Sequence, residues 1–459
     1  MRQLSVAIER SESDSRLSEA VLAFLSRQVL QAAPARSGTP EMSVREALLG
    51  SVARITEVAK GDLAVELALR RYAGTALQGM GELRAAAVEY ERAIEIVDST
   101  ANREVPLLPP AKFVEALGAY GLILSAIQDP TAIEIQERAF AESKARCGDA
   151  HAATIQAESR LLAGRIKRDG FLAVRGRLED LYERAISVLG VSDTRTRLVR
   201  GLLIMGLAYG DLVDRERAAI LMGLELETSR ESPKDALADA TRVIQLEVLV
   251  ANGDPSAIAV GQELVNDTAK LFRSSTPQAT VRCALLMRAL RYHGRWHEAL
   301  GVARTRVDSQ GAAETSSAAD RMDAWLDLAV AAAEARDAES ARAALASAEA
   351  ERGNVPADSS RLAVAELDRV RANALLGDRG SAATHAAALR VAIAAITDSR
   401  PAALEAQREA GAVLARILAA AGAHNEAMNE ARKYLDTCNK CGLQEGELAL
   451  EMKALLLTR

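Results

Sequence analysis

The chain has 459 residues, more than the roughly 250–300 residues at which a single hydrophobic core stops growing. Apolar residues make up 49 % of it and aromatic residues only 3 %, and the apolar residues are mostly alanine and leucine, which favour helices over strands. The 57 lysines and arginines against 63 aspartates and glutamates give a net charge of −6, which argues against the basic surface of a nucleic-acid-binding protein.

Three absences narrow the class of protein further. The sequence contains no run of about 18 apolar residues that could span a membrane. Its first residues, Met1 to Arg16, are polar and charged, unlike a signal peptide, and its four cysteines are too few for a disulfide framework. We therefore expect a soluble, cytoplasmic chain without a cofactor. An extracytoplasmic location is the alternative if the chain is a piece of a membrane-anchored regulator.

The N-terminal region is predicted to hold two helices and a loop. Apolar periodicity predicts a helix over Leu17–Leu30, and a stretch rich in proline, glycine and serine predicts a loop over Ala33–Met42. A second helix is expected over Ser43–Ala59, because Ser43 and Glu46 have the spacing of a capping box.

An internal repeat is visible in the segment Tyr90–Ile94, whose five residues recur as Tyr182–Ile186. Relative to a turn at Gly81, the position seven residues before it and the positions five, nine and twelve residues after it hold small residues or residues that are usually buried. Further turns with the same offsets are predicted at Gly294, Arg336, Gly377 and Gly422, and two looser ones at Val213-Asp214 and Asn252-Gly253. The offset positions hold Gly74, Ala86, Tyr90 and Ala93; Met287, Ala299, Ala303 and Arg306; Ala329, Ala341, Leu345 and Ala348; Val370, Ala382, Ala386 and Leu389; Ala415, Ala427, Ala431 and Tyr434.

Small residues at these offsets indicate antiparallel helix pairs that cross closely. One pair cannot bury its apolar face alone, so pairs must stack into an all-α superhelical solenoid, here of about nine pairs. We expect a Pro-rich break at Val105–Pro110, a polar loop at Ser309–Ala319 and a closing helix at Glu445–Leu457. The predicted segments are a leader or cap over residues 1–66, the array in two parts over 67–310 and 311–437, and a C-terminal cap over 438–459.

The repeat resembles the tetratricopeptide repeat (TPR), in which a Trp-x2-Leu-Gly-x2-Tyr helix is followed by a helix with spaced alanines. The best matches are Trp325, Leu328, Ala329, Ala341, Leu345 and Ala348, and then Ala73, Gly74, Leu77, Ala86, Tyr90 and Ala93. From Gly294 to Gly422 the turns recur every 41 to 45 residues, whereas TPRs repeat about every 34. The resemblance therefore implies TPR-like pairs with lengthened helices or linkers.

A second resemblance lies in the leader. Residues Arg16–Leu25 and Thr39–Leu49 are similar to the segment that opens the C-terminal TPR region of bacterial Ser/Thr kinases and winged-helix regulators. This resemblance implies a sensory or regulatory TPR protein.

Two short motifs suggest metal or redox chemistry. Cys438-x-x-Cys441 could be half of a zinc site or a redox pair, but a second ligand pair and a βαβ context are lacking. The alternative is a pair of structural thiols in the turn after a helix that ends at Lys433–Leu435. His293 and His297 have metal-ligand spacing, yet Gly294 between them predicts that they straddle a turn. Motifs of hydrolases, phosphate-binding loops and zinc proteases are missing from the sequence, so an enzyme is not expected.

An arginine series is the candidate binding site. The position six before the turn, which would face the concave groove, holds Arg288, Arg371 and Arg416. Arg291 and Tyr292 fall beside the same surface, and Arg71 and Arg200 would extend it. Guanidinium groups suit carboxylates, so we hypothesise a groove for an acidic or C-terminal peptide. The alternative is that these arginines pair with local glutamates and aspartates.

These observations predict a non-catalytic scaffold or adaptor that binds a peptide or partner protein in the groove of a solenoid. Nucleic acid is not expected as a partner. The alternative function is a sensory or regulatory module that works with a kinase or transcription factor and responds to a small ligand.

Overall fold

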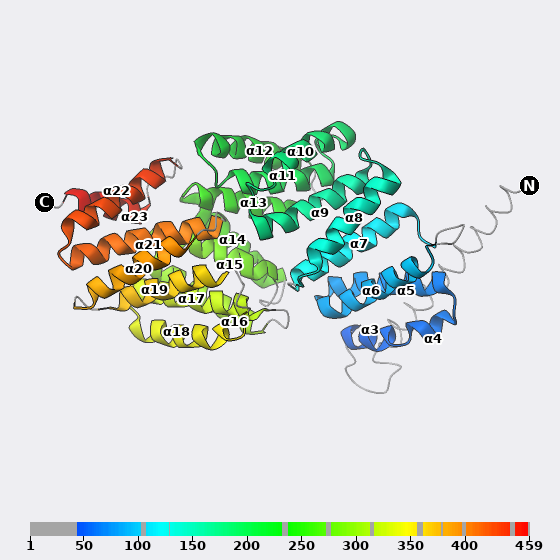
Figure 1. Cartoon of the computed structure of the whole chain (residues 1–459), viewed down its shortest axis with the longest axis horizontal. Coiled ribbons are helices and arrows are strands. Elements are labelled where there is room, and N and C mark those ends of the chain that lie inside the picture. The colour runs from blue at the N-terminus through cyan, green and yellow to red at the C-terminus, as the bar shows by residue number, and fades with distance from the viewer. Residues whose placement is uncertain are drawn as a thin grey trace, which may run out of the picture. The chain divides into compact units, whose positions relative to one another are not determined.

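The computed structural model describes residues 44–101, 107–127, 129–231, 237–271, 277–312, 316–355, 361–377, 380–396, 401–440 and 446–457. Over these ranges the chain forms 21 helices and no strand, which confirms the all-α prediction (Figure 1). None of the described helices is both long and apolar enough to cross a membrane. The predicted helix Leu17–Leu30, the loop Ala33–Met42, the N-cap Ser43 and the thiol of Cys441 lie outside the described residues.

The chain divides into two compact units. The N-terminal unit comprises Met1–Arg168 and Glu183–Leu189, and the C-terminal unit comprises Asp169–Tyr182 and Gly190–Arg459. In the N-terminal unit the described helices are α3 (Val44–Val52), α4 (Ile55–Ala59), α5 (Leu63–Gly79), α6 (Leu83–Ser99), α7 (Pro110–Ala126), α8 (Ala132–Cys147) and α9 (Ala152–Asp169). Helix α10 (Arg175–Leu189) contributes residues to both units.

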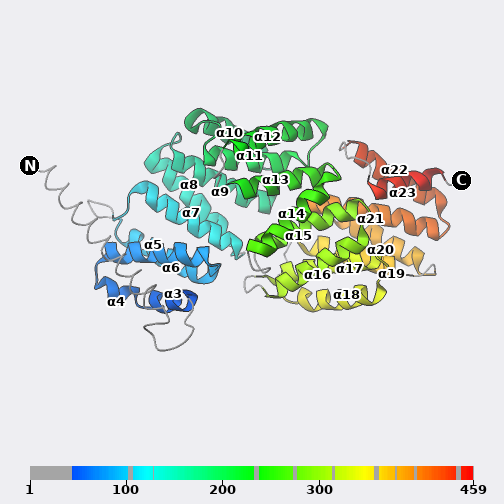
Figure 2. The ribbon, with the colours of Figure 1, turned by 180° about the vertical axis from the view of Figure 1, so that it is seen from behind.

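The C-terminal unit contains the remaining helices. They are α11 (Thr194–Leu207), α12 (Leu212–Arg230), α13 (Ala238–Ala251), α14 (Ser256–Leu271), α15 (Pro277–Tyr292), α16 (Trp296–Ala312), α17 (Ala318–Glu334), α18 (Ala338–Arg352), α19 (Arg361–Leu376), α20 (Ala382–Ala395), α21 (Pro401–Ala420), α22 (His424–Lys440) and α23 (Glu447–Leu457). Neighbours along the chain pack as pairs, for example α15 with α16, α17 with α18 and α21 with α22. Figures 1 and 2 show the pair α17–α18 side by side from opposite faces.

The predicted turns join these pairs. Gly81 lies between α5 and α6, and the turns at Gly294, Arg336, Gly377 and Gly422 each join the two helices of one of the last four pairs before α23. Gly294 has a φ of 68° and Arg336 a φ of 64°, so both turns use the left-handed region that reverses the chain after a helix. Asn252 and Gly253 likewise join α13 to α14.

The small residues at the repeat offsets lie inside the helix pairs. All of them are buried except Leu345, which is partly buried. A Cβ added to Gly74 would lie 2.9 Å from the ring of Tyr90, so that crossing requires glycine. The core around α15–α19 is correspondingly rich in alanine, with Ala329–Ala333 all buried. Close crossing of helices thus follows from the sequence pattern.

Three local predictions were wrong. Val213-Asp214 is not a turn, because Asp211 caps α12 by accepting a hydrogen bond from the backbone N–H of Asp214 at 3.0 Å. The helix predicted over Ser43–Ala59 is interrupted after Val52, where the Arg54 N–H bonds the Ser51 carbonyl in a tight turn. Ser309–Ala319 is not wholly a loop, because α16 continues to Ala312 and the Ser309 hydroxyl donates to a carbonyl of the same helix.

The end of the C-terminal unit contacts the turn between α15 and α16. A Cβ on Gly446 would lie 2.5 Å from the carbonyl oxygen of Tyr292, and one on Gly294 would lie 2.6 Å from Glu447. Trp296, the first residue of α16, packs against a cluster that contains Tyr434 of α22 and Leu448 of α23. In an open solenoid each pair contacts only its neighbours. Here segments about 150 residues apart meet, as the Tyr292–Gly446 approach requires.

Candidate functional site

Buried ion pairs join the first helices of successive pairs in the C-terminal unit. Arg291 of α15 pairs with Asp327 of α17 at 3.1 Å and with Glu409 of α21. Glu409 also accepts a hydrogen bond from Arg371 of α19, whose side chain is fully buried. Arg371 lies 3.8 Å from Glu334 as well. These partners all belong to the chain itself, so the two buried guanidinium groups are engaged within the fold.

Two carboxyl groups of this network have pKa values that shift in opposite directions. Burial alone would raise the pKa of Glu409, but the guanidinium groups of Arg291 and Arg371 outweigh it and lower the pKa to about 2. Burial raises the pKa of Asp368 to about 6, and the same two arginines counter it only in part. The negative charge of Glu409 also raises the pKa of Asp368, and the Oδ1 atom of Asp368 has no hydrogen-bond partner.

Arg288 links α15 to two other parts of the unit. Its guanidinium pairs with Glu405 of α21, lies 3.4 Å from Glu247 of α13 and donates to the Tyr209 hydroxyl at 2.7 Å. It also lies over the Tyr209 ring, 5.5 Å from the centroid. The separation along the chain between Arg288 and Glu405 is 117 residues, so this pair connects distant segments.

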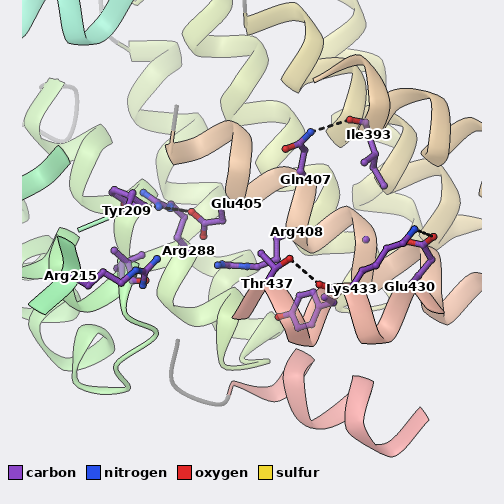
Figure 3. Close-up of a pocket in the computed structure, with 14 residues that line it drawn as sticks. Tyr209, Arg215, Arg288, Ile393, Glu405, Gln407, Arg408, Glu430, Lys433 and Thr437 are labelled. Atoms are coloured by element: carbon purple, nitrogen blue, oxygen red, sulfur yellow. Dashed lines mark hydrogen bonds and ion pairs between the residues drawn. The ribbon is translucent and has the colours of Figure 1, made fainter. Parts of the chain in front are cut away.

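Beside Arg288 lies a cavity of about 450 Å³ (Figure 3). One wall comes from the segment α11–α15 and the other from α20–α22. Figure 3 shows Arg215 and Arg288 on one side and Arg408 on the other, with the guanidinium groups of Arg215 and Arg408 turned toward each other. The lining residues are Tyr209, Arg215, Val250, Ala251, Arg288, Ile393, Glu405, Gln407, Arg408, Gly411, Glu430, Lys433, Tyr434 and Thr437.

Cationic side chains outnumber carboxylates in this lining. Four cations, Arg215, Arg288, Arg408 and Lys433, face two carboxylates, Glu405 and Glu430. Glu405 is engaged by Arg288. Glu430 pairs with Lys433 at 2.8 Å, but the lysine side chain is 71 % exposed. Another anion can therefore replace Glu430 as the partner of Lys433 at little cost. The cavity is therefore suited to a negatively charged group.

Arg408 is the most distinctive member of the lining. None of the described residues accepts a hydrogen bond from its guanidinium or lies within ion-pair distance of it, and its buried Nε has no partner. The guanidinium lies over the Tyr292 ring, 5.6 Å from the centroid. Burial by itself would lower the pKa of Arg408, but the nearby Glu405 carboxylate and other groups raise it above its ordinary value. Arg408 thus stays charged with its donors available.

Arg215 faces the same cavity from α12. Its guanidinium donates to the carbonyl oxygens of Gly210 at 3.1 Å and Ala251 at 2.5 Å, and to the Asn252 side chain at 3.3 Å. These three acceptors are neutral, and they fix the orientation of the guanidinium across the end of α13. Arg215 is therefore a positioned cation opposite Arg408.

The predicted arginine series occupies several environments. Arg288 lines the cavity, whereas Arg291, Tyr292 and Arg371 are buried beside it. Arg416 makes two hydrogen bonds to Glu334, and its side chain is 29 % exposed. Two members lie elsewhere: Arg200 is buried in α11 against Glu225, and Arg71 lies on α5 in the N-terminal unit.

Arg215, Arg408 and Lys433 were not among the residues predicted from the sequence. None of these residues stands six positions before a turn, and the meeting of the two walls depends on contacts between distant segments. The sequence did contain one signal: Glu405, Arg408 and Glu409 place three charges within five residues of a helix that is otherwise mostly alanine and leucine.

The cysteine and histidine motifs form no metal site in the described part of the chain. Over those residues, no group of three or more metal-ligating side chains comes together. Cys438 is a buried thiol inside α22, which continues to Lys440 and so does not end at Lys433–Leu435 as predicted. His293 lies in the turn after α15 and His297 on α16, so they straddle the turn as predicted. Burial lowers the pKa of His293.

Comparison with protein-family models and with curated proteins gives no match to this chain. The lining of the cavity contains neither histidine nor cysteine, and its cationic groups are arranged to hold an anion.

Proposed function

We propose that this chain is a non-catalytic binding protein, a scaffold of TPR-like helix pairs that captures a carboxylate-bearing segment of a partner protein. The binding site is the cavity between the α11–α15 wall and the α20–α22 wall. The observation that carries this proposal is Arg408, a largely enclosed guanidinium that none of the described residues neutralises by a direct contact.

Desolvation of Arg408 favours the binding of an anion. Enclosing a charged group without a partner is unfavourable, and an arriving carboxylate recovers that loss through charge-assisted hydrogen bonds. A guanidinium presents a planar set of donors that can grip a carboxylate in two places. Arg215 and the exposed end of Lys433 add positive charge around the same hollow. A C-terminal or side-chain carboxylate of a peptide is the protein group with this chemistry.

The TPR-like assignment is supported by the buried small residues at the pair crossings and by the turns that follow each first helix. It is weakened by repeats of 41 to 45 residues and by the contact of the chain's end with the α15–α16 turn. We therefore propose lengthened TPR-like pairs as the framework that carries the cavity.

Calorimetric titration tests the proposed function with a short synthetic peptide that ends in two glutamates and has a free C-terminus. We expect the wild-type chain to bind it, and Arg408→Gln to weaken binding about tenfold or more, the effect of losing one charge-assisted contact. Arg304→Gln is the matched control, because Arg304 is an exposed arginine on α16. Equal binding by wild type and Arg408→Gln would reject the proposed site.

A sensory or regulatory module that responds to a small ligand is the second candidate function. It is favoured by the cavity volume of about 450 Å³, which falls within the range of small-molecule pockets of about 300–1,000 Å³. The same titration with free succinate and free glutamate separates the two candidates. Tighter binding of a small acid than of the peptide favours the regulatory module, and the reverse order favours the scaffold.

A further inference from the structure

The cavity is formed by two walls that lie far apart in the sequence. Arg215 belongs to α12, and Arg408 belongs to α21, 193 residues later in the printed sequence. Any group that contacts both of these side chains therefore connects α12 to α21. How much this connection adds depends on the contacts that already hold the two walls together.

Contacts on two sides join the α20–α22 wall and α23 to α15 and its turn. On the cavity side, over the part of the chain that the structure describes, they include the ion pairs Arg288–Glu405 and Arg291–Glu409 and the stacking of Arg408 on the Tyr292 ring. On the other side they are the approach of Gly446 to the Tyr292 carbonyl and the packing of Trp296 beside Leu448. Helices α15 and α21 are not one of the closely packed helix pairs, so side chains make most of the contact between them.

Two cationic side chains face each other across this junction. Arg215 donates to the carbonyl oxygens of Gly210 and Ala251, and the Arg408 guanidinium points toward it from the opposite wall (Figure 3). A carboxylate placed between two guanidinium groups is attracted by both of them. An anionic group at this place therefore favours approach of the two walls.

We propose that a single carboxylate bound between Arg215 and Arg408 holds the two walls together, so that partner binding and docking of α21–α23 are coupled. This inference rests on the proposed function and adds regulation to it. Coupling of this kind is reciprocal: the ligand strengthens docking, and any change that weakens docking lowers affinity for the ligand. The chain then signals occupancy of its cavity through the state of its last three helices.

A glycine substitution outside the cavity tests the reciprocal effect without changing any charge. Gly446→Ala introduces a Cβ 2.5 Å from the Tyr292 carbonyl oxygen and so pushes α23 away from the α15–α16 turn. Its matched control is Gly301→Ala, because a Cβ at Gly301 meets nothing within 4 Å. With the peptide ending in two glutamates, we expect Gly446→Ala to weaken binding about three- to tenfold and Gly301→Ala to leave it unchanged.

Hydrogen exchange of the wild-type chain measures the forward effect and does not depend on a variant that folds. We expect the peptide to slow amide exchange in α23 and in the last turn of α15. Arg215→Gln and Arg408→Gln should each weaken peptide binding about tenfold, and the double variant by clearly less than the product, since one carboxylate is shared.

The outcomes separate the inference from the proposed function. If the peptide binds through Arg408 but neither slows exchange in α23 nor responds to Gly446→Ala, the coupling is overturned and the proposed site stands. Strictly multiplicative losses at Arg215 and Arg408 overturn the shared carboxylate in the same way. If the wild-type chain does not bind the peptide at all, both proposals fall.

Discussion

Asp368 and Glu409 show how two carboxyl groups can share the same arginines and still differ in charge. Glu409 accepts hydrogen bonds from Arg291 and Arg371, and its pKa is lowered to about 2. Asp368 lies among the same charges without a hydrogen bond to its Oδ1, and burial raises its pKa to about 6. The positive charges of Arg291 and Arg371, with the hydrogen bond from Arg371, outweigh burial at Glu409, whereas at Asp368 they do not, and the charge of Glu409 adds to the effect of burial there.

Asp368→Asn should therefore stabilise the chain at neutral and alkaline pH. The pKa of Asp368 in the folded state, about 6, lies above its ordinary value of 3.8. Protonated Asp368 therefore contributes its full stabilisation below about pH 4, and this contribution is lost as the pH rises through 6. Asparagine avoids the ionisation, and we expect a gain of about 1–3 kcal/mol at pH 8. Urea unfolding at pH 4.5 and pH 8 checks this expectation. The same difference at both pH values would contradict the role of the ionised Asp368.

At the scale of elements, much of the fold follows from local sequence. A glycine after a helix, or another residue that can adopt a positive φ, predicts the turn. Small residues at fixed offsets from the turn predict where two helices cross. Gly294 and the crossing of Gly74 with Tyr90 are examples in which the structure agrees with this reasoning. The failure at Val213-Asp214 has a local cause as well, since the capping aspartate Asp211 stands two residues earlier.

The turns at Gly294 and Gly422 offer a matched comparison. Both glycines have positive φ, but a Cβ at Gly294 would meet Glu447, whereas one at Gly422 would meet nothing within 4 Å. Gly422→Ala should lose about 1–2 kcal/mol from backbone strain alone. Gly294→Ala should lose more, because it also displaces the start of α23. Chemical denaturation of both variants measures the difference, and equal losses would argue against a tight contact between Glu447 and this turn.

At the scale of the whole molecule, the contact of the chain's end with the α15–α16 turn was not predictable from the sequence. Repeat offsets describe each pair and its neighbour, and they contain no information about contacts across 150 residues. The predicted series therefore included Arg288, which lines the cavity, but omitted Arg215 from the same wall and Arg408 from the opposite wall. Of the four cationic side chains that line the cavity, only Arg288 was predicted from the sequence.

Docking of α23 has an optical reporter in Trp296. The chain has two tryptophans, so Trp325→Phe leaves Trp296 as the single emitter beside Leu448. Leu448 is buried, and Leu448→Ala should lose about 2–4 kcal/mol and shift the emission of Trp296 to longer wavelength. Leu450→Ala on the same helix is the control, because Leu450 is 48 % exposed. Identical emission spectra of the two variants would contradict the packing of α23 on Trp296.

The central claim is that Arg408, and not the internally paired arginines of the predicted series, captures a carboxylate. It is tested most directly by calorimetric titration of the peptide ending in two glutamates into wild type, Arg408→Gln and Arg416→Gln. Arg416 is a suitable comparison because it is partly exposed but already bonded to Glu334. The account predicts a loss of about tenfold for Arg408→Gln and less than about twofold for Arg416→Gln. An equal loss for both variants, or a loss for Arg416→Gln alone, would contradict it.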